Sequence, residues 1–218
     1  APTWAKSERN WRKVIEITEA IGKSVLWLDE VEKMFAGAES SGETDGGTTS
    51  RMLASFLTWM QEKKSQTFVC ATANDVTKLP PEFLRKGRFD EMFFVDLPTT
   101  SDREAIWRIH ATKAGYSALE TEDLFLDFQT LAKQTVDWTG AEIEGALDEA
   151  RREALATESK RVTTDLLLGI IRKTTPLAQA APEPITRLRE WAKARAIRKA
   201  SKPEPGTGKA DHRKRTMN

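Results

Sequence analysis

Two short apolar runs, each followed by polar side chains, constrain the fold of this chain more than any other feature. Residues 24–28 (SVLWL) lead directly to Asp29 and Glu30, and residues 67–71 (TFVCA) lead to Asn74. Runs that are apolar at every position are typical of parallel strands covered on both faces. The sequence therefore predicts a parallel sheet with these polar side chains at its carboxyl edge, where α/β proteins bind ligands.

Helical patterns separate the predicted strands. Apolar residues recur at helical spacing over residues 7–22, 51–63 and 101–114, and residues 92–97 (MFFVDL) form a third apolar run. Residues 37–49, which are rich in Gly, Ser and Thr, predict a flexible loop, and residues 79–85 predict a short helical turn. Alternating strands and helices indicate a parallel sheet with crossover helices.

After about residue 116 only helical patterns follow. They cover residues 124–134, 139–157, 163–173 and 185–199, and the second opens on a capping-box spacing from Thr139 to Glu142. The polar, basic stretch 201–218 buries too little apolar surface to fold and is predicted to be disordered. The predicted domains are an α/β part over residues 1–115, a helical part over 116–200 and this tail.

The composition favours a globular protein without a strong electrostatic preference. The chain has 39% hydrophobic and 31% charged residues and a net charge of +1, so it is not committed as a whole to nucleic acid. No window approaches the ~18 apolar residues of a membrane span. Its single cysteine, Cys70, lies in an apolar run and predicts a buried structural thiol in a reducing compartment.

The polar residues at the strand ends are candidates for phosphate chemistry. Asp29 could hold a magnesium ion, often through water, and Glu30 could polarise an attacking water. Asn74 could orient water or touch a γ-phosphate without adding negative charge. Taken one at a time, each motif has a simpler interpretation: two solvated acids at a strand end, and a turn formed by Asn and Asp.

Two arginines flank a glycine a little further along. Arg85 and Arg88 lie in the segment LRKGRFDE, just before the third predicted strand. Arginine is always charged and forks onto phosphate oxygens, which makes both residues candidates for contact with a nucleotide. The simpler interpretation is a basic surface loop.

The order and spacing of these motifs resemble the AAA family of ATPases over roughly residues 7–175. The succession is LWLDE, then TAN, then LPPEFLRKGRFDE, then a third strand and helices opening on WTGAEI. Within the family the residues of these motifs are most similar to those of AAA proteins of cyanobacteria and plastid genomes. The resemblance implies the fold: an incomplete parallel-sheet α/β core of the P-loop NTPase (AAA+) class, followed by an α-helical lid domain.

The resemblance also implies a role for each candidate. Asp29 corresponds to the magnesium-binding acid of the Walker B strand, acting through water, and Glu30 to the acid that activates water. Asn74 corresponds to the first sensor. Arg85 and Arg88 correspond to the two arginine fingers, which reach the nucleotide of the adjacent protomer.

The resemblance assigns a further pair to the lid. Gly140 and Ala141 correspond to the start of the helix that closes on adenosine, with Ala141 at the position where other clades carry a second-sensor arginine. Asp137 replaces a usual Gly, and we expect it to keep the left-handed turn, which Asp tolerates. The implied ligands are ATP or ADP with Mg²⁺. The implied assembly is a hexameric homo-oligomer acting on a macromolecule, expected to be a protein, in the cytoplasm or the plastid stroma.

The phosphate-binding motif G-x-x-x-x-G-K-[ST] does not occur in these 218 residues. The family places that loop before the helix that begins here near Ser7, so we expect a truncated start and no hydrolysis by this chain alone. Its absence also predicts a gap in the sheet, because the family's first strand lies between the strands at 67–73 and 92–97. Two other hypotheses stay open: a non-catalytic subunit that donates arginine fingers, and a nucleic-acid-associated protein that uses its basic tail.

Overall fold

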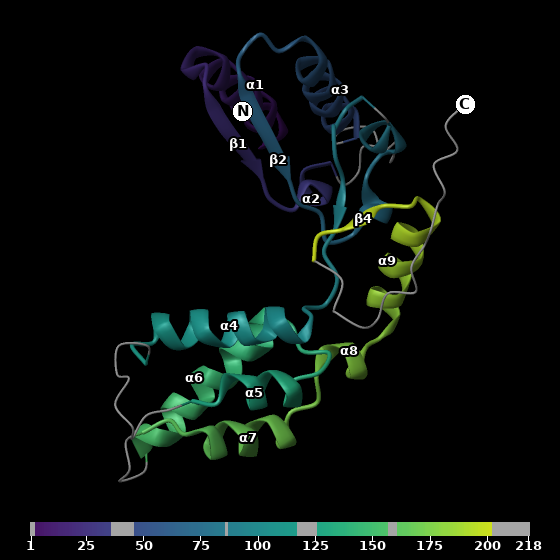
Figure 1. Cartoon of the computed structure of the whole chain (residues 1–218). Helices are drawn as coiled ribbons and strands as arrows, with labels where there is room; N and C mark the ends of the chain where they lie inside the picture. Colours follow the sequence, from purple (N-terminus) through teal and green to yellow (C-terminus); the bar gives the residue numbers. More distant parts are fainter. Residues whose placement is uncertain (1–2, 36–45, 86, 117–125, 157–160, 202–218) are drawn as a thin grey trace, which may run out of the picture. The chain divides into compact units, whose positions relative to one another are not determined.

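The computed structural model describes residues 3–35, 46–85, 87–116, 126–156 and 161–201. Contacts divide the chain into two compact units, residues 1–92 and residues 93–218 (Figure 1). The first unit is α/β with a parallel strand pair, and the second is mainly helical. This confirms the predicted class, a mixed α/β part followed by a helical region.

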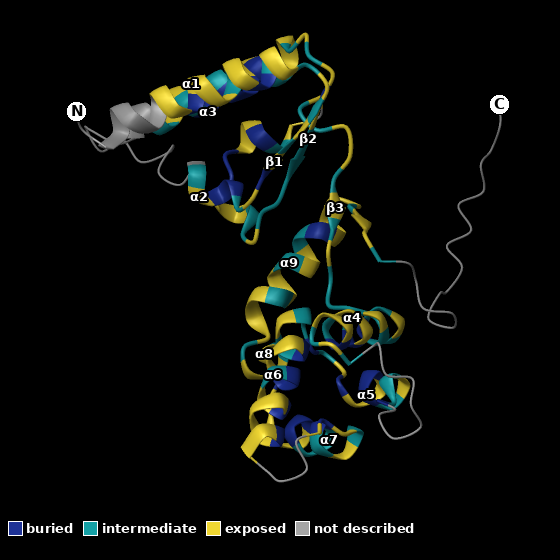
Figure 2. Cartoon of the chain, turned by 90° about the vertical axis from the view of Figure 1, so that its left-hand side faces the viewer, coloured by how far each residue is buried: buried dark blue, intermediate teal, exposed yellow. Residues whose placement is uncertain are grey.

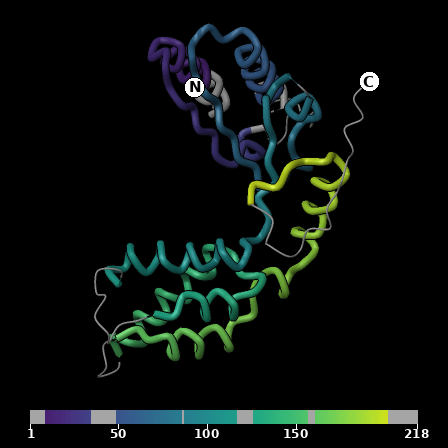
Figure 3. The backbone as a smooth tube through the Cα atoms, in the orientation of Figure 1, coloured from purple at the N-terminus to yellow at the C-terminus, as the bar shows by residue number. Residues whose placement is uncertain are grey.

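The first unit is built on two parallel strands, β1 (Ser24–Leu28) and β2 (Thr67–Ala71), paired in register from Ser24 with Thr67 to Leu28 with Ala71. The chain runs from β1 through α2 (Val31–Phe35) and α3 (Gly46–Glu62) back to β2 (Figure 3). The helix α1 (Thr3–Ile21) packs against α3 and β1. A crossover of this kind brings the carboxyl ends of both strands to one edge.

Aromatic side chains fill the core beneath this sheet. Phe56 is fully buried, and its ring lies 5.4 Å from Trp11, 5.8 Å from Phe83 and 6.1 Å from Trp59, measured between ring centroids. Aromatic pairs at such distances add about 0.5–1.5 kcal/mol each beyond the burial of their area. The 3₁₀ turns η1 (Val76–Lys78) and η2 (Pro81–Leu84) carry Phe83 into this core.

The opposite face of the strand pair differs from the prediction. Val25, Trp27 and Phe68 are 67%, 61% and 68% exposed, and Cys70 on the same face is half-buried rather than buried (Figure 2). The expectation of cover on both faces is therefore wrong for the described residues. An apolar run shows what a strand is able to bury, but within the described ranges Val25, Trp27 and Phe68 stay exposed on this face.

The second unit is a cluster of helices around a buried tryptophan. It contains α4 (Thr100–Lys113), α5 (Phe128–Gln134), α6 (Gly140–Ala156), α7 (Thr164–Lys173), α8 (Leu177–Ala180) and α9 (Glu183–Ala194). Trp107 is fully buried and donates from Nε1 to Thr135 Oγ1 at 3.4 Å. The second unit starts at Phe93, and α4 belongs to it because α4 packs on α5 and α6. The sequence-based boundary after residue 115 stays a prediction about domains.

One predicted strand and one predicted helix need correction in this unit. The strand predicted over 92–97 is reduced to β3 (Phe93–Phe94), and the helix predicted over 185–199 ends with α9 at Ala194. Residues Arg198–Lys199 form β4, which pairs in parallel with β3. Ala196 takes a left-handed conformation (φ 53°), which ends the helical path and turns the chain toward β3.

Asp96 fixes this pairing. Its carboxylate accepts hydrogen bonds from Arg189 Nε at 2.8 Å and Lys199 Nζ at 2.7 Å. Burial raises the pKa of Asp96, but the bonds from Lys199 and Arg189 outweigh it, so that the pKa of the carboxyl lies below its usual range. The charged form is therefore the one that holds α9 and β4 against β3.

The remaining differences concern ends of elements. The helix predicted over 51–63 begins five residues earlier, at Gly46, so the residues 46–49 predicted as loop belong to its first turns. Gly and Thr are weak helix formers, which is why the pattern assigned them to the loop. The rest of the predicted loop, residues 37–45, and the predicted disordered tail from residue 202 lie outside the described residues.

Candidate functional site

The candidate site begins where β1 and β2 end together. The ladder continues one step past the strands, since Thr72 N donates to Leu28 O and Val31 N donates to Thr72 O, both at 2.9 Å. Asp29 and Glu30 therefore leave β1 beside Thr72, which leaves β2. The predicted convergence of polar groups at this edge follows directly from the parallel register.

The hydroxyl of Thr72 joins the two predicted acids. It donates to Asp29 Oδ1 and accepts from the backbone N–H of Glu30 at 3.1 Å. Glu30 has a left-handed backbone (φ 52°), a conformation that is strained for a residue with a Cβ. Thr72 thus supports a strained acid at the sheet edge, and sequence reasoning did not single it out.

The carboxylate of Glu30 is engaged by two donors. Asn74 Nδ2 donates to Glu30 Oε1 at 2.9 Å, so the structure brings these two predicted site residues into direct contact. Lys33 Nζ lies 2.6 Å from Glu30 Oε2, and its hydrogen bond to Glu30 raises the pKa of Lys33. Lys33 was also missed, because a lysine three residues after an acid is an ordinary surface pair.

The carboxylates at this edge of the sheet fit a magnesium ion that takes only part of its ligands from the protein. Within the described ranges no three or more His, Cys, Asp or Glu side chains are arranged to hold a metal ion. Mg²⁺ is commonly bound through one or two carboxylates, with water and substrate phosphates completing its shell. Asp29, which is exposed beside Glu30, suits that incomplete set of ligands.

The two predicted finger arginines lie in different surroundings. Arg88 is half-buried and donates from Nη1 to Leu57 O, on α3, at 2.7 Å. Arg85 is exposed, and its carbonyl accepts from Arg88 N at 3.3 Å across a turn that contains Gly87 (φ 87°). Arg88 is therefore more than a solvated basic residue, whereas Arg85 projects from the loop.

The lid residues begin α6 in the second unit. The capping box is present: Thr139 Oγ1 accepts from Glu142 N at 3.3 Å, and Glu142 Oε2 accepts from Thr139 N at 2.7 Å. Asp137 has φ 64°, the left-handed turn expected of it. Fixed caps of this kind hold the first turn of α6, with Gly140 and Ala141, in a defined position.

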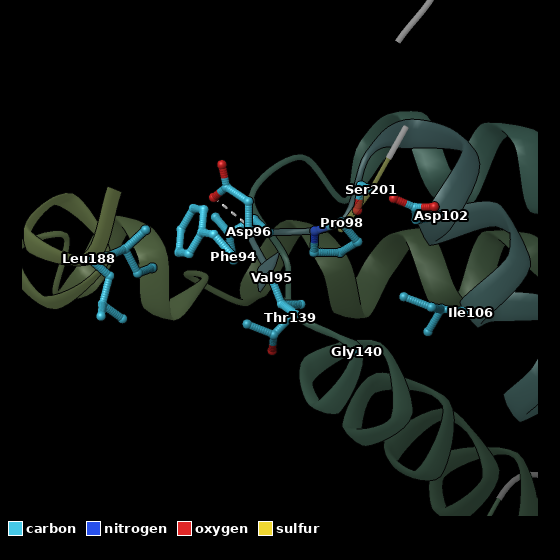
Figure 4. A pocket seen from close by; sticks show the side chains of 12 residues that line it. Phe94, Val95, Asp96, Pro98, Asp102, Ile106, Thr139, Gly140, Leu188 and Ser201 are labelled. Atoms are coloured by element: carbon cyan, nitrogen blue, oxygen red, sulfur yellow. Dashed lines mark hydrogen bonds between the residues drawn. The ribbon is translucent and has the colours of Figure 1, made fainter. Parts of the chain in front are cut away.

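A cavity of about 420 Å³ opens beside that first turn (Figure 4). Gly140, Thr139 and Ile106 line it together with the segment Phe94 to Pro98. A Cβ on Gly140 would lie 3.9 Å from two carbons of Ile106, an ordinary contact, so this Gly is not required by packing. Ala141 is exposed and is not among the residues that line the cavity.

The sequence has clear relatives. The model for the ATPase family associated with various cellular activities (AAA) matches residues 2–97. An "Uncharacterized AAA domain-containing protein ycf46" of Guillardia theta is 41% identical over 196 residues, which are 90% of this chain and 37% of that protein. The corresponding ycf46 protein of Pyropia yezoensis is 39% identical over the same length. The chain thus spans well under half the length of these relatives.

A more distant relative is a proteasome-activating nucleotidase of Archaeoglobus fulgidus. It is 30% identical over 173 residues, which cover 76% of this chain and 42% of that protein.

None of the helices within the described ranges is both long enough and apolar enough to cross a membrane.

Proposed function

This chain belongs to the AAA family of ATPases, and on that premise we propose that it is part of a longer, ring-forming protein that couples magnesium-dependent ATP hydrolysis to remodelling of another macromolecule. We propose a hexamer of identical protomers, with a protein as substrate. The proposed location is the cytoplasm, or the plastid stroma where the gene is carried by a plastid. In this proposal the longer protein also carries the phosphate-binding loop.

One observation carries the proposal. Asp29, Glu30 and Asn74 meet at the carboxyl edge of two parallel strands, with Thr72 bonded to both acids and Asn74 bonded to Glu30. Two solvated acids at a strand end would not need a hydroxyl and an amide from the neighbouring strand. A set of hydrogen-bonded groups that is held this closely suits a reaction whose catalysis depends on positioning.

The residues divide the work of hydrolysis as follows. Asp29 would bind the magnesium ion through water, and the ion would supply charge stabilisation to the phosphates. Glu30 would orient and polarise the attacking water. Asn74, which contacts Glu30, would report the state of the γ-phosphate to that carboxylate. Gly140 and Ala141, at the start of α6, would close on adenosine.

Arg85 and Arg88 would act on the nucleotide that the neighbouring protomer binds. The exposed Arg85 suits direct contact with the neighbour's phosphates, where two nitrogen donors can pair with phosphate oxygens. Arg88, which is bonded to α3, would hold the loop from the inside and reach the nucleotide after that bond opens.

This 218-residue chain alone is expected to hydrolyse no ATP above background, whereas the longer protein does so with Mg²⁺. The reason is that the motif G-x-x-x-x-G-K-[ST], whose lysine and backbone amides cradle the β- and γ-phosphates, does not occur in these 218 residues. Release of phosphate from both proteins at equal concentration is the measurement. Magnesium-dependent turnover by the short chain that Glu30→Gln abolishes would show that the chain holds its own phosphate site.

Removing the Thr72 hydroxyl is expected to lower kcat of the longer protein by about 10- to 100-fold, because the strained Glu30 loses its support. Thr72→Val makes this change with nearly the same shape, and Thr72→Ser restores the hydroxyl and should restore most of the rate. Steady-state ATP hydrolysis measures both.

Thr77→Val is the matched control for that experiment. The Thr77 hydroxyl also donates to a carboxylate, but to that of Asp75, at 2.5 Å, and not to that of Asp29 or Glu30. Its rate should stay near that of the wild type. Equal rates for Thr72→Val and Thr72→Ser would mean that the hydroxyl does not position Glu30.

A further inference from the structure

A buried acid beside the site has no role in the function proposed so far. Glu32 lies on α2, two residues after Glu30, and is only 4% exposed. Within the described residues its Oε2 is buried without a hydrogen-bond partner. Burying a carboxylate without full hydrogen bonding costs free energy, so a purely structural role would be better served by an apolar or amide side chain.

The other oxygen of Glu32 contacts the predicted sensor. Oε1 accepts a hydrogen bond from the backbone N–H of Asn74 at 3.2 Å. The side chain of the same Asn74 donates to Glu30 at 2.9 Å. Asn74 is itself exposed, and the residue follows the end of β2, so this backbone bond is what ties its peptide to a buried side chain.

We propose that Glu32 is a positioning residue for hydrolysis. Its buried carboxylate holds the backbone N–H of Asn74, so that the side-chain amide of Asn74 meets Glu30. This inference rests on the proposed function and deepens it. The line of contact runs from the buried Glu32 through the backbone of Asn74 to its side chain and then to the carboxylate that would activate water.

The proposal makes stability and activity respond differently to one substitution. Glu32→Met has a similar length and no strong acceptor, so it removes the bond to Asn74 and also removes a poorly paired buried carboxylate. The expected result is a melting temperature no lower than that of the wild type, together with faster hydrogen exchange at the backbone N–H of Asn74. Glu32→Gln keeps an acceptor at Oε1 and is expected to keep the protection of that amide.

The first measurement is amide hydrogen exchange by NMR in this 218-residue chain, which needs no ATP hydrolysis. We expect the backbone amide of Asn74 to exchange at least about 10-fold faster in Glu32→Met, because it loses its hydrogen bond to Glu32 Oε1. The amide of the buried Phe56 reports global opening and should be unchanged. Loss of protection at both amides with a lower melting temperature would make Glu32 a structural residue and overturn the proposal.

The second measurement is ATP hydrolysis by the longer protein. We expect Glu32→Met to lower kcat by about 10-fold or more with KM nearly unchanged, and Glu32→Gln to keep most of the rate. Glu16→Met, at an exposed acid on α1, is the matched control and should match the wild type. No hydrolysis by the wild type would reject the proposed function, whereas an active wild type with an equally active Glu32→Met would reject only the role of Glu32.

Discussion

Glu30→Gln is expected to stop ATP hydrolysis by the longer protein while leaving ATP binding nearly unchanged. Glutamine keeps the shape of Glu30 and an oxygen that can accept from Asn74 Nδ2, but it loses the charge that polarises water. General acid–base groups typically contribute 10²–10⁴-fold to rate, so kcat should fall by about that factor. The loss concerns the chemical step, because in this proposal Glu30 acts on the attacking water and not on the base or the ribose.

Two measurements on the same preparation separate chemistry from binding. Release of phosphate gives kcat, and equilibrium binding of ATP with Mg²⁺ gives the dissociation constant. Glu62→Gln, at an exposed acid at the end of α3, makes the same chemical change away from the site and should behave like the wild type. A Glu30→Gln protein that turns over ATP like the wild type would remove Glu30 from the mechanism.

The parts of the site that follow from strand geometry were predictable from sequence. The apolar run at residues 24–28 gives the bounds of β1, and that at 67–71 gives those of β2. Parallel pairing then brings Asp29, Glu30 and Asn74 to one edge whatever the rest of the fold does. The caps of α6 were predictable for a similar reason, because a Thr-to-Glu spacing of three acts within one turn.

Contacts between segments far apart in sequence were not predictable. The bond from Arg88 to Leu57 O spans 31 residues, and nothing in the pattern around Arg88 distinguishes it from Arg85. Thr72 looks like any strand-end threonine. The burial of Glu32 depends on which face of the short helix α2 turns inward, and five residues are too few to show an amphipathic period.

The pairing of β3 with β4 was missed for a different reason. Residues 195–199 continue a pattern compatible with helix. The left-handed turn at Ala196 has an alanine in place of the glycine that would have predicted it. What fixes the segment is the pair of bonds from Arg189 and Lys199 to Asp96, about a hundred residues earlier in the chain. Local helix propensity contains no information about such a bond, and tertiary contacts of this kind override the propensity.

Arg85→Ala is expected to cut hydrolysis by the longer protein by roughly 10³–10⁵, the range for loss of an arginine finger, with little change in ATP affinity of the isolated protomer. The reason is that the guanidinium of Arg85 would act on the neighbour's nucleotide and not on its own. Arg88→Ala is expected to reduce hydrolysis as well, because the loop loses its bond to Leu57 O. Arg187→Ala, at an exposed arginine on α9, is the control and should keep the wild-type rate.

The central claim is that this chain contributes to an ATPase site shared between two protomers, and mixing two inactive variants tests it most directly. Glu30→Gln keeps its fingers but has no working site, and Arg85→Ala keeps its site but cannot serve a neighbour. When both longer proteins are mixed, some interfaces join an intact site to intact fingers. Hydrolysis should therefore return in part and should rise with protein concentration, since recovery requires assembly. No recovery under conditions where both variants demonstrably co-assemble would contradict the account and leave Arg85 as a surface charge.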